Sequence, residues 1–185
     1  MTNMTAAEAF RLLNVSRETA ARLEAYGSLL QKWQERINLV SSSTLADLWR
    51  RHILDSGQTF RHLPAATRVV VDLGAGAGFP GLVLAAMGVP EVHLVESDIR
   101  KCAFLREAAR VMGLSVSVHA KRIEKISPFP VDVVTARALA PLSELLHYAE
   151  PFLSQAQRDE KSVECLFLKG RTAEDELTAA GKEWN

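Results

Sequence analysis

From about residue 67 onward, short apolar runs alternate with segments of helical periodicity, and this alternation restricts the fold more than any other feature. The runs predicted as strands are residues 68–73, 92–95, 116–119, 131–136 and 163–168. The segments predicted as helices are residues 80–87, 98–112 and 141–153. Because the strands are almost continuously apolar, both faces of their sheet should be covered. The pattern therefore predicts an α/β fold with a doubly wound, mainly parallel sheet.

The N-terminal third of the chain has a helical pattern instead. Apolar residues recur at three- and four-residue steps from Ala20 to Ile37, which predicts one amphipathic helix, and Ser16 is the expected start of that helix. Ser41 to Thr44 interrupt the pattern, and residues 45–60 predict a second amphipathic helix. We expect residues 1–62 to form a small helical extension and residues 63–185 to form the α/β core, within one structural domain overall.

The composition is that of an ordinary globular chain, with 48% hydrophobic and 24% charged residues. Lysine and arginine together number 22, as do aspartate and glutamate, so the net charge argues mildly against a strongly basic nucleic-acid binder. Cys102 and Cys165 lie too far apart for a short metal-ligand motif, and we expect both to be buried thiols. No signal peptide or apolar run of about 18 residues is apparent. We expect a cytoplasmic monomer without a metal.

A glycine-rich loop follows the first predicted strand, with Gly74, Gly76 and Gly78 alternating with alanine. Such a turn needs unusual backbone angles and lets a ligand approach bare backbone at a helix N-terminus. Residues 76–81 satisfy the G-x-G-x-x-G dinucleotide fingerprint. Counting from the strand-proximal Gly74 gives acidic-x-G-x-G-x-G, led by Asp72. This register is similar to the first motif of class I methyltransferases, which bind S-adenosylmethionine.

Two further observations bear on the choice of ligand. An acidic Asp72 suits a ligand with a cationic amino group and sulfonium, and it would be a poor neighbour for a pyrophosphate. Glu96 ends the second predicted strand and could accept both hydroxyls of a ribose, which both cofactors carry. The methyl donor is favoured, while a dinucleotide and a glycine turn without a ligand stay open as alternatives.

Several ordered motifs resemble one particular family. They are DLGAGAGFPG at 72–81, LVESDIRKCAFL at 94–105, RIE at 122–124, TARALAPL at 135–142, LKG at 168–170, Asn38-Leu39 and RHILDS at 51–56. Together they resemble the bacterial small-subunit (16S) ribosomal RNA guanine-N7 methyltransferases, once called glucose-inhibited division protein B. The resemblance extends from about residue 30 to residue 177. Phe79-Pro80-Gly81 after the glycine loop and RH-x-x-DS before it are its most specific parts.

The resemblance implies a fold, an activity and a cofactor site. It implies a class I methyltransferase fold with a small N-terminal helical extension, S-adenosylmethionine as cofactor, and 16S ribosomal RNA or the small ribosomal subunit as substrate. Gly74 and Phe79 match positions that contact the cofactor, Ile123 and Glu124 match the pair beside its adenine, and Arg137 matches an arginine of the cofactor and substrate site. The family more often has alanine where Ile123 stands. Its members usually close the sheet with a C-terminal strand pair, which we expect to be missing here.

Methyl transfer to guanine N7 needs no catalytic acid or base, because N7 already carries an in-plane lone pair. The task of the enzyme is then mainly to position the reactants, which can contribute roughly 7–11 kcal/mol. None of the histidines needs a chemical role. Arg137 is the residue expected to act, by bonding or stacking on guanine or by holding the cofactor carboxylate. Its simpler interpretation is an arginine at a strand end paired with a carboxylate.

Basic residues flank the predicted site and are candidates for binding RNA. The candidates are Arg51, His52, Lys121, Arg122, Lys125, Lys169 and Arg171. Arg51 and Asp55 either form a surface pair or, with His52, bridge the helical extension to the cofactor loop. The lysines and arginines after the third and fifth strands either contact phosphates or only favour solubility. Lys101, Arg106 and Arg110 are expected to form a solvated helix face, with phosphate contact as the alternative.

Other functions also fit the residues. The residues themselves are compatible with a class I methyltransferase acting on a small molecule or a protein. They are also compatible with a non-catalytic nucleotide-binding module or a dinucleotide dehydrogenase. Transfer of labelled methyl groups to RNA distinguishes these from the activity that the resemblance implies.

Overall fold

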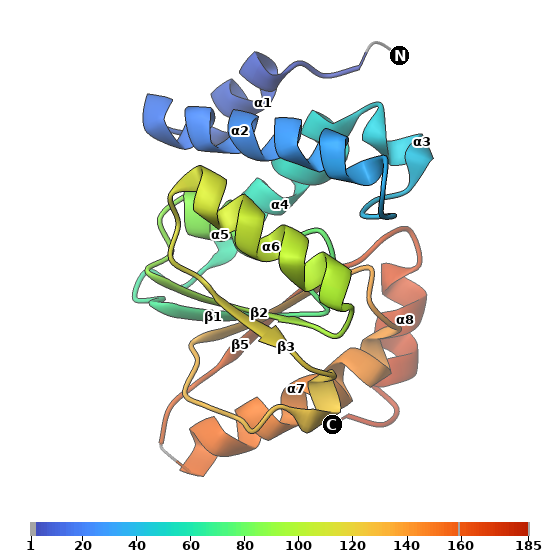
Figure 1. Cartoon of the computed structure of the whole chain (residues 1–185). Helices are drawn as coiled ribbons and strands as arrows, with labels where there is room; N and C mark the ends of the chain where they lie inside the picture. Colours follow the sequence, from blue (N-terminus) through green and yellow to red (C-terminus); the bar gives the residue numbers. More distant parts are fainter. Residues whose placement is uncertain (1–2, 159, 185) are drawn as a thin grey trace.

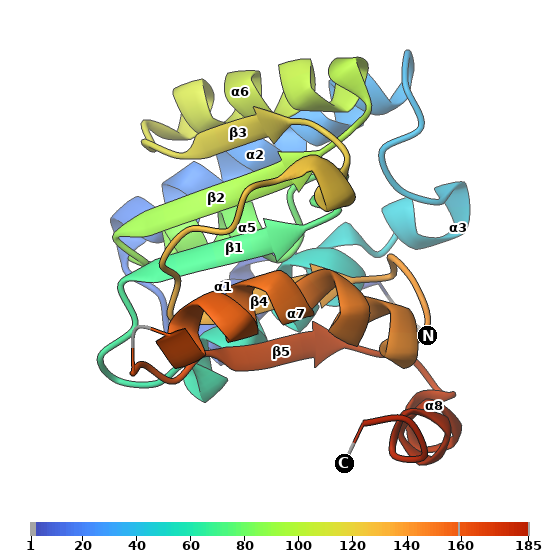
Figure 2. The ribbon, with the colours of Figure 1, turned by 90° about the horizontal axis from the view of Figure 1, so that it is seen from below.

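The computed structural model, which describes residues 3–158 and 160–184, contains one parallel sheet with the strand order β3-β2-β1-β4-β5 (Figures 1 and 2). The strands are β1 (Val69–Leu73), β2 (Glu91–Glu96), β3 (Ser117–Ala120), β4 (Val133–Arg137) and β5 (Glu164–Leu168). Neighbouring strands pair in parallel, with Leu73 opposite Val95 and Ala136. The order reverses beside β1, which confirms the predicted doubly wound α/β fold.

Helices cover both faces of the sheet (Figure 1). On one face lie α5 (Gly81–Ala86) and α6 (Ile99–Met112), with the N-terminal helices beyond them, and on the other lies α7 (Leu142–Arg158). Successive residues of a strand point to opposite faces. Accordingly Val70 packs in the cluster beneath α5 and α6, whereas Val71 packs in the cluster beneath α7. The helix predicted for residues 141–153 continues through Pro151 to Arg158, and α8 (Ala173–Ala180) follows β5.

The N-terminal extension begins with α1 (Ala6–Leu13) and α2 (Arg17–Gln34). Asn14, in the left-handed conformation, ends α1, so residues 5–60 contain separate helices. The Ser16 hydroxyl accepts a hydrogen bond from the Thr19 backbone N–H, which confirms the predicted start of the long helix. That helix ends at Gln34 and not at Ile37, because the Arg36 N–H bonds to the Trp33 carbonyl, three residues back, in a turn.

The segment predicted as one helix over residues 45–60 changes its hydrogen bonding several times. It contains the π-helix η1 (Trp49–Leu54), α4 (Asp55–Gln58) and the start of the 3₁₀ helix η2 (Thr59–His62). A short helix α3 (Ser42–Leu45) precedes it, where the sequence predicts an interruption. Wider π-turns frequently accompany functional sites in helices. Here the π-turn carries Arg51 and His52, two of the candidate site residues.

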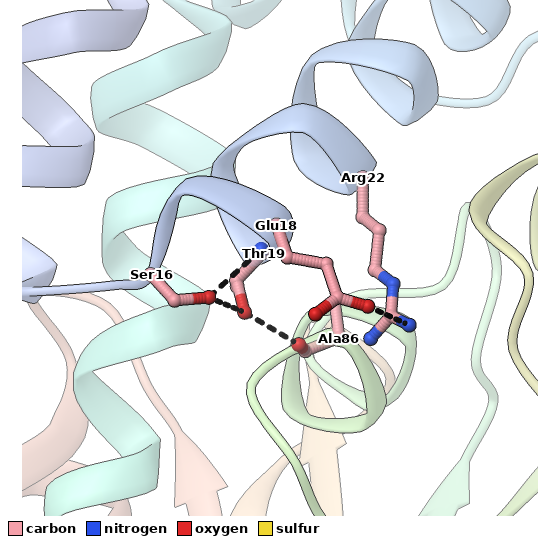
Figure 3. A network of polar contacts seen from close by, with 5 residues as sticks. All are labelled: Ser16, Glu18, Thr19, Arg22 and Ala86. Atoms are coloured by element: carbon pink, nitrogen blue, oxygen red, sulfur yellow. Dashed lines mark hydrogen bonds and ion pairs between the residues drawn. The ribbon is translucent and has the colours of Figure 1, made fainter.

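A polar link joins the start of α2 to the end of α5 (Figure 3). The Thr19 hydroxyl donates to the Ala86 carbonyl at 3.2 Å and accepts from the Ser16 hydroxyl at 3.1 Å. Ala86 is buried, so this carbonyl would otherwise lack a partner at the helix end. The bond ties the helical extension to the core.

The two cysteines differ in burial. Cys102 is fully buried as expected, whereas Cys165 on the edge strand β5 is only partly buried. Within the described part of the chain, no helix is both long and apolar enough to cross a membrane.

Candidate active site

A cavity of about 1160 Å³ opens at the carboxyl ends of the strands. Residues that follow each strand line it, including Gly74 after β1, Glu96 at the end of β2 and Arg137 at the end of β4. The extension supplies the opposite wall through residues 39–41, 44, 50–52, 54–55 and 58. Ligands of doubly wound sheets bind at this edge, near the reversal of strand order. The cavity is therefore the candidate active site.

The glycine loop forms the floor of this cavity, with positive φ angles of 65° at Gly74, 55° at Gly76 and 93° at Gly78. A Cβ on Gly78 would lie 2.5 Å from Leu82, so glycine is needed there for packing. At Gly76 the nearest atom to an added Cβ is the Gly74 carbonyl oxygen at 3.7 Å, an ordinary van der Waals contact, so the surrounding residues do not fill this position. A ligand can thus approach the Gly76 backbone, as expected for this loop.

Asp72 supports the loop from behind and does not line the cavity. Its buried carboxylate accepts hydrogen bonds from the Gly81 N–H at 2.9 Å and the Thr135 hydroxyl at 3.1 Å. Burial raises the pKa of Asp72 to about 7, against the opposing effects of these bonds and of Arg137. The sequence predicts that Asp72 and Gly78 contact the cofactor; in the structure neither residue lines the cavity, and a Cβ on Gly78 would meet Leu82 and Leu105.

Glu96 lies on the cavity wall with both carboxylate oxygens held by backbone donors. Oε2 accepts from the Gly76 N–H at 2.9 Å and Oε1 from the Asp98 N–H at 2.7 Å. Only 8% of Glu96 is exposed. Each oxygen retains a further lone pair, so the side chain is fixed and can still accept hydroxyl donors.

The far side of the cavity is formed after β3 by the short 3₁₀ helix η3 (Ile123–Lys125). Ile123 packs against the core beneath α7, and Glu124 is exposed on the wall. Lys121, Arg122 and Lys125 line an adjoining pocket of about 600 Å³, which also includes Ser97. The structure thus brings the predicted adenine-side and basic residues together at one end of the cavity.

Arg137 connects the strand end to the helical extension. Its Nη1 donates to the Arg51 carbonyl at 3.0 Å and to Asp55 Oδ2 at 3.1 Å, and its Nη2 lies 2.6 Å from His52 Nδ1. The sequence left two possibilities for Arg51, His52 and Asp55: a surface pair between Arg51 and Asp55, or a bridge from the helical extension. The structure shows a bridge, because Asp55 pairs with Arg137 of the core. The Arg137 side chain is 15% exposed, so this ion pair is shielded from water on one side.

His52 is held as a neutral ring within this cluster. Because Nδ1 faces the Arg137 guanidinium, which only donates, Nε2 carries the proton and donates to the Thr44 hydroxyl at 2.8 Å. The ring also stacks on Phe79, with centroids 5.0 Å apart. Burial, and then the charges of Arg137 and Arg51, lower the pKa of His52 to about 4. His52 is buried, so it is a structural part of the wall more than an exposed RNA contact.

Sequence reasoning missed two side chains that shape the site. The fully buried Tyr26 of α2 donates its hydroxyl to the Ala77 carbonyl in the glycine loop. The Gln34 amide accepts from the Leu39 and Val40 N–H groups, each at 3.0 Å, and donates to the Val40 carbonyl at 2.8 Å. A tyrosine on an apolar helix face needs a partner for its hydroxyl, and this was the available signal.

The basic residues at the remaining edge of the site have different environments. Lys169, after β5, donates to the Ala140 carbonyl at 2.7 Å and pairs with Glu176, so its charge is already engaged. Arg171 is exposed and lies outside the cavity wall. Lys101 lines the cavity, whereas Arg110 pairs with Glu107 on the surface of α6.

Comparison with known proteins identifies the family. Residues 19–185 match the family model GidB, described as rRNA small subunit methyltransferase G. The chain belongs to this family. A protein of Paramagnetospirillum magneticum named ribosomal RNA small subunit methyltransferase G is 63% identical over 92% of this chain and 80% of its own length. One of Gluconobacter oxydans with the same name is 50% identical over 94% of this chain and 86% of its own length.

A solved structure supports the fold. The branched-chain polyamine synthase C9 mutein of Thermus thermophilus aligns with a TM-score of 0.51 at 20% identity, over 73% of this chain and 39% of that chain. This likeness supports the doubly wound α/β fold of the chain. The family assignment in turn confirms the resemblance seen in the glycine loop and the flanking motifs.

The residues present fit S-adenosylmethionine, the cofactor expected for this family. Gly76 has no side chain and lines the cavity, and Glu96 presents carboxylate oxygens beside it, as a ribose diol requires. Within residues 3–158 and 160–184, no group of three or more histidine, cysteine, aspartate or glutamate side chains is arranged to hold a metal ion.

Proposed function

We propose that this chain transfers the methyl group of S-adenosylmethionine to N7 of a guanine in 16S ribosomal RNA. The observation that carries the proposal is the bond from the Gly76 N–H to Glu96, which sets a bare glycine loop beside a fixed carboxylate at the strand ends. Membership of a family described as rRNA small subunit methyltransferase G supports the choice of acceptor. When bound, the cofactor supplies a methyl group activated by its sulfonium.

The cofactor would be held by residues around the loop. Glu96 would accept the ribose hydroxyls, and the backbone of Gly74 and Gly76 would approach the methionine part. Ile123 and Glu124, at the β3 side, would contact the adenine. Asp72 and Gly78 would act indirectly, because they fix the shape of the loop from the interior. Phe79 contributes through its ring, which lies beneath the Arg137 guanidinium.

Guanine N7 would bond to the methyl carbon through its lone pair as the carbon–sulfur bond breaks and the sulfur leaves as a neutral thioether, so this chain need not remove a proton from the acceptor. The role of the side chains is then to orient the base and to exclude water. Arg137 suits this role, since each of its terminal nitrogens is fixed by partners from the extension. A guanidinium held in this way presents a rigid cationic plane to the cavity.

Basic residues around the opening would contact RNA phosphates. Lys121, Arg122 and Lys125 line the adjoining pocket and are exposed, and Arg51 lies on the extension wall. Lys169 and Arg171 are weaker candidates, because Lys169 is engaged by Glu176 and Arg171 lies away from the wall. We further propose that the protein acts as a monomer, without a metal, in the cytoplasm, on 16S RNA either free or within the small subunit.

The test combines a cellular and a purified assay. N7-methylguanine is mapped in 16S ribosomal RNA from cells with and without the gene, and one site should lose its methyl group when the gene is absent. In parallel, the purified protein with labelled donor is offered 16S RNA, small subunits, a protein mixture and small molecules. Label in RNA alone supports the proposal. Transfer to another acceptor, or donor binding without any transfer, would overturn it.

A further inference from the structure

The cavity has room for more than the cofactor. At about 1160 Å³ it exceeds the 300–1,000 Å³ of ordinary small-molecule pockets. The wall next to the cofactor loop is supplied by the core, while the opposite wall comes from the helical extension. The extension wall therefore faces the space left for an acceptor base.

A guanine differs from other bases in the groups on its pairing edge. It presents N1–H and N2–H₂ donors, whereas adenine presents an acceptor at N1. A fixed carboxylate with a free oxygen matches the two guanine donors and repels the adenine acceptor. The carboxylates on the cavity wall belong to Asp55, Glu96, Glu124 and Glu176.

Three of these carboxylates are poorly suited to the base. Glu96 is held by the Gly76 and Asp98 N–H groups, and its remaining lone pairs are the proposed acceptors for the cofactor ribose. Glu176 accepts from Lys169, Thr172 and the Leu142 N–H. Glu124 lies beside β3, and β2 and β1 separate that strand from β4.

Asp55 differs from these three carboxylates in its position beside Arg137 and in having one carboxylate oxygen without a hydrogen-bond partner among the described residues. Its other oxygen, Oδ2, accepts from Arg137 Nη1 at 3.1 Å. The Asp55 side chain is 50% exposed and lines the cavity, and Arg137 in turn is fixed over the Phe79 ring. A carboxylate held by a rigid arginine is arranged for binding before the ligand arrives.

We infer that Asp55 determines specificity for guanine by accepting the N1–H and N2–H₂ groups through its free oxygen. Arg137 is the positioning residue that orients this carboxylate. The inference rests on the proposed function and deepens it, because it names the group that recognises the acceptor base. Adenine at the same place would set two acceptors against each other, which disfavours its binding.

The test compares two RNA substrates that differ only in the 2-amino group of the target base. 16S RNA is prepared by ligation with guanosine or inosine at the mapped target position, and kcat/KM for methyl transfer is measured for each. Wild-type protein should prefer guanosine by about tenfold, the effect of losing one charged hydrogen bond. In Asp55→Asn the amide oxygen can keep the bond to Arg137, while the amide NH₂ replaces the free acceptor. This variant should lose about tenfold or more on guanosine and prefer it over inosine by less than twofold.

Two other variants separate recognition from structure. Glu18→Gln removes an exposed pair with Arg22 outside the cavity and should leave both rates unchanged. Glu124→Gln removes a carboxylate across the cavity and should lower both rates by the same factor. Unaltered melting temperature and donor affinity of Asp55→Asn verify its fold.

The possible results have distinct meanings. A wild-type protein that treats guanosine and inosine alike would overturn the role of Asp55, as would an Asp55→Asn variant that keeps the wild-type preference. A wild-type protein that methylates neither RNA would instead refute the proposed function itself.

Discussion

The guanidinium carbon of Arg137 lies 4.9 Å from the ring centroid of Phe79, which joins the end of β4 to the loop that follows β1. His52 stacks on the same ring from the helical extension. A cation over an aromatic face is stabilised by the ring quadrupole, most strongly where water is excluded. Phe79 is 4% exposed, so this contact is a fixed part of the cavity wall.

Arg137→Ala should reduce kcat by about 100-fold, because displaced reacting groups lose much of the advantage of positioning. Arg137→Lys should recover only part of this loss, since an ammonium cannot serve Asp55, His52 and the Arg51 carbonyl together. Steady-state kinetics and donor titration measure the effects. Arg110→Ala, which removes an exposed pair with Glu107, is the control and should behave as wild type. Wild-type turnover and donor affinity in Arg137→Ala would exclude the role.

Gly76→Ala should mainly weaken donor binding, whereas Gly78→Ala should mainly reduce stability. At Gly76 an added methyl group makes an ordinary contact at 3.7 Å and costs about 1–2 kcal/mol for its positive φ, so the fold should survive. Donor affinity should nevertheless fall by about tenfold or more, because the methyl group stands where the cofactor approaches. Gly78→Ala would place a carbon 2.5 Å from Leu82 and should mainly lower stability.

Thermal melting and isothermal titration with S-adenosylmethionine distinguish these two effects. The same loss of stability in both variants, or an unchanged donor affinity in Gly76→Ala, would contradict the assignment of Gly76 to the ligand side.

The pKa of His52 predicts a loss of stability in acid. Its folded-state pKa is lowered from 6.5 to about 4, so the unfolded chain binds more protons between these values. The stabilisation is complete above about pH 6.5 and is lost as the pH falls toward 4, by up to about 3 kcal/mol. His52→Asn keeps an acceptor toward Arg137 and removes this titration. Urea unfolding of both proteins at several pH values measures the difference.

Two other groups contribute to the same pH profile, which is why the difference between the two proteins is the informative quantity. Burial lowers the pKa of His119, so part of the acid loss remains in the variant. Burial raises the pKa of Asp72 to about 7, which gives the opposite slope, a loss of stability as the pH rises from about 4 to 7. Identical pH profiles for wild type and His52→Asn would refute the assignment to His52.

Activity on RNA should fall steeply with ionic strength, because phosphate contacts release counterions. Replacement of Lys121, Arg122 and Lys125 by alanine should reduce the slope of log affinity against log salt by up to about 2, at roughly 0.7 for each single-strand contact. Filter binding at several salt concentrations measures this slope. The matched control replaces Arg22, Arg100 and Arg110, surface residues with local carboxylate partners. A flat salt response in the wild type would remove the phosphate proposal.

Local patterns were sufficient to predict the sheet, the glycine loop and the ends of several helices. Strand and helix periodicities are properties of short segments, and the spacing of Gly74 and Gly76 after β1 depends only on neighbours in the chain. The same locality explains why Ser16 could be predicted as a helix start.

Features that depend on distant contacts were not predictable in this way. The π-turn at Trp49–Leu54 adapts the chain to the cavity wall, where His52 and Asp55 meet Arg137 more than 80 residues away along the chain. Asp72 was expected beside the ligand because it ends a strand at the ligand edge. Its carboxylate instead points inward and accepts from the Gly81 N–H, because α5 packs against β1 with its first residue beside Asp72.

The hydroxyl of Tyr26 donates to the Ala77 carbonyl, so α2 directly supports the loop that we propose to hold the donor. Thermodynamic coupling is reciprocal, so a donor that rigidifies the loop must also stabilise the helix that supports it. Amide hydrogens in the middle of α2, far from any contact with the ligand, should therefore exchange more slowly when S-adenosylmethionine is bound. Natural variation in this helix can then tune how tightly the enzyme retains its cofactor without altering a single residue of the cavity.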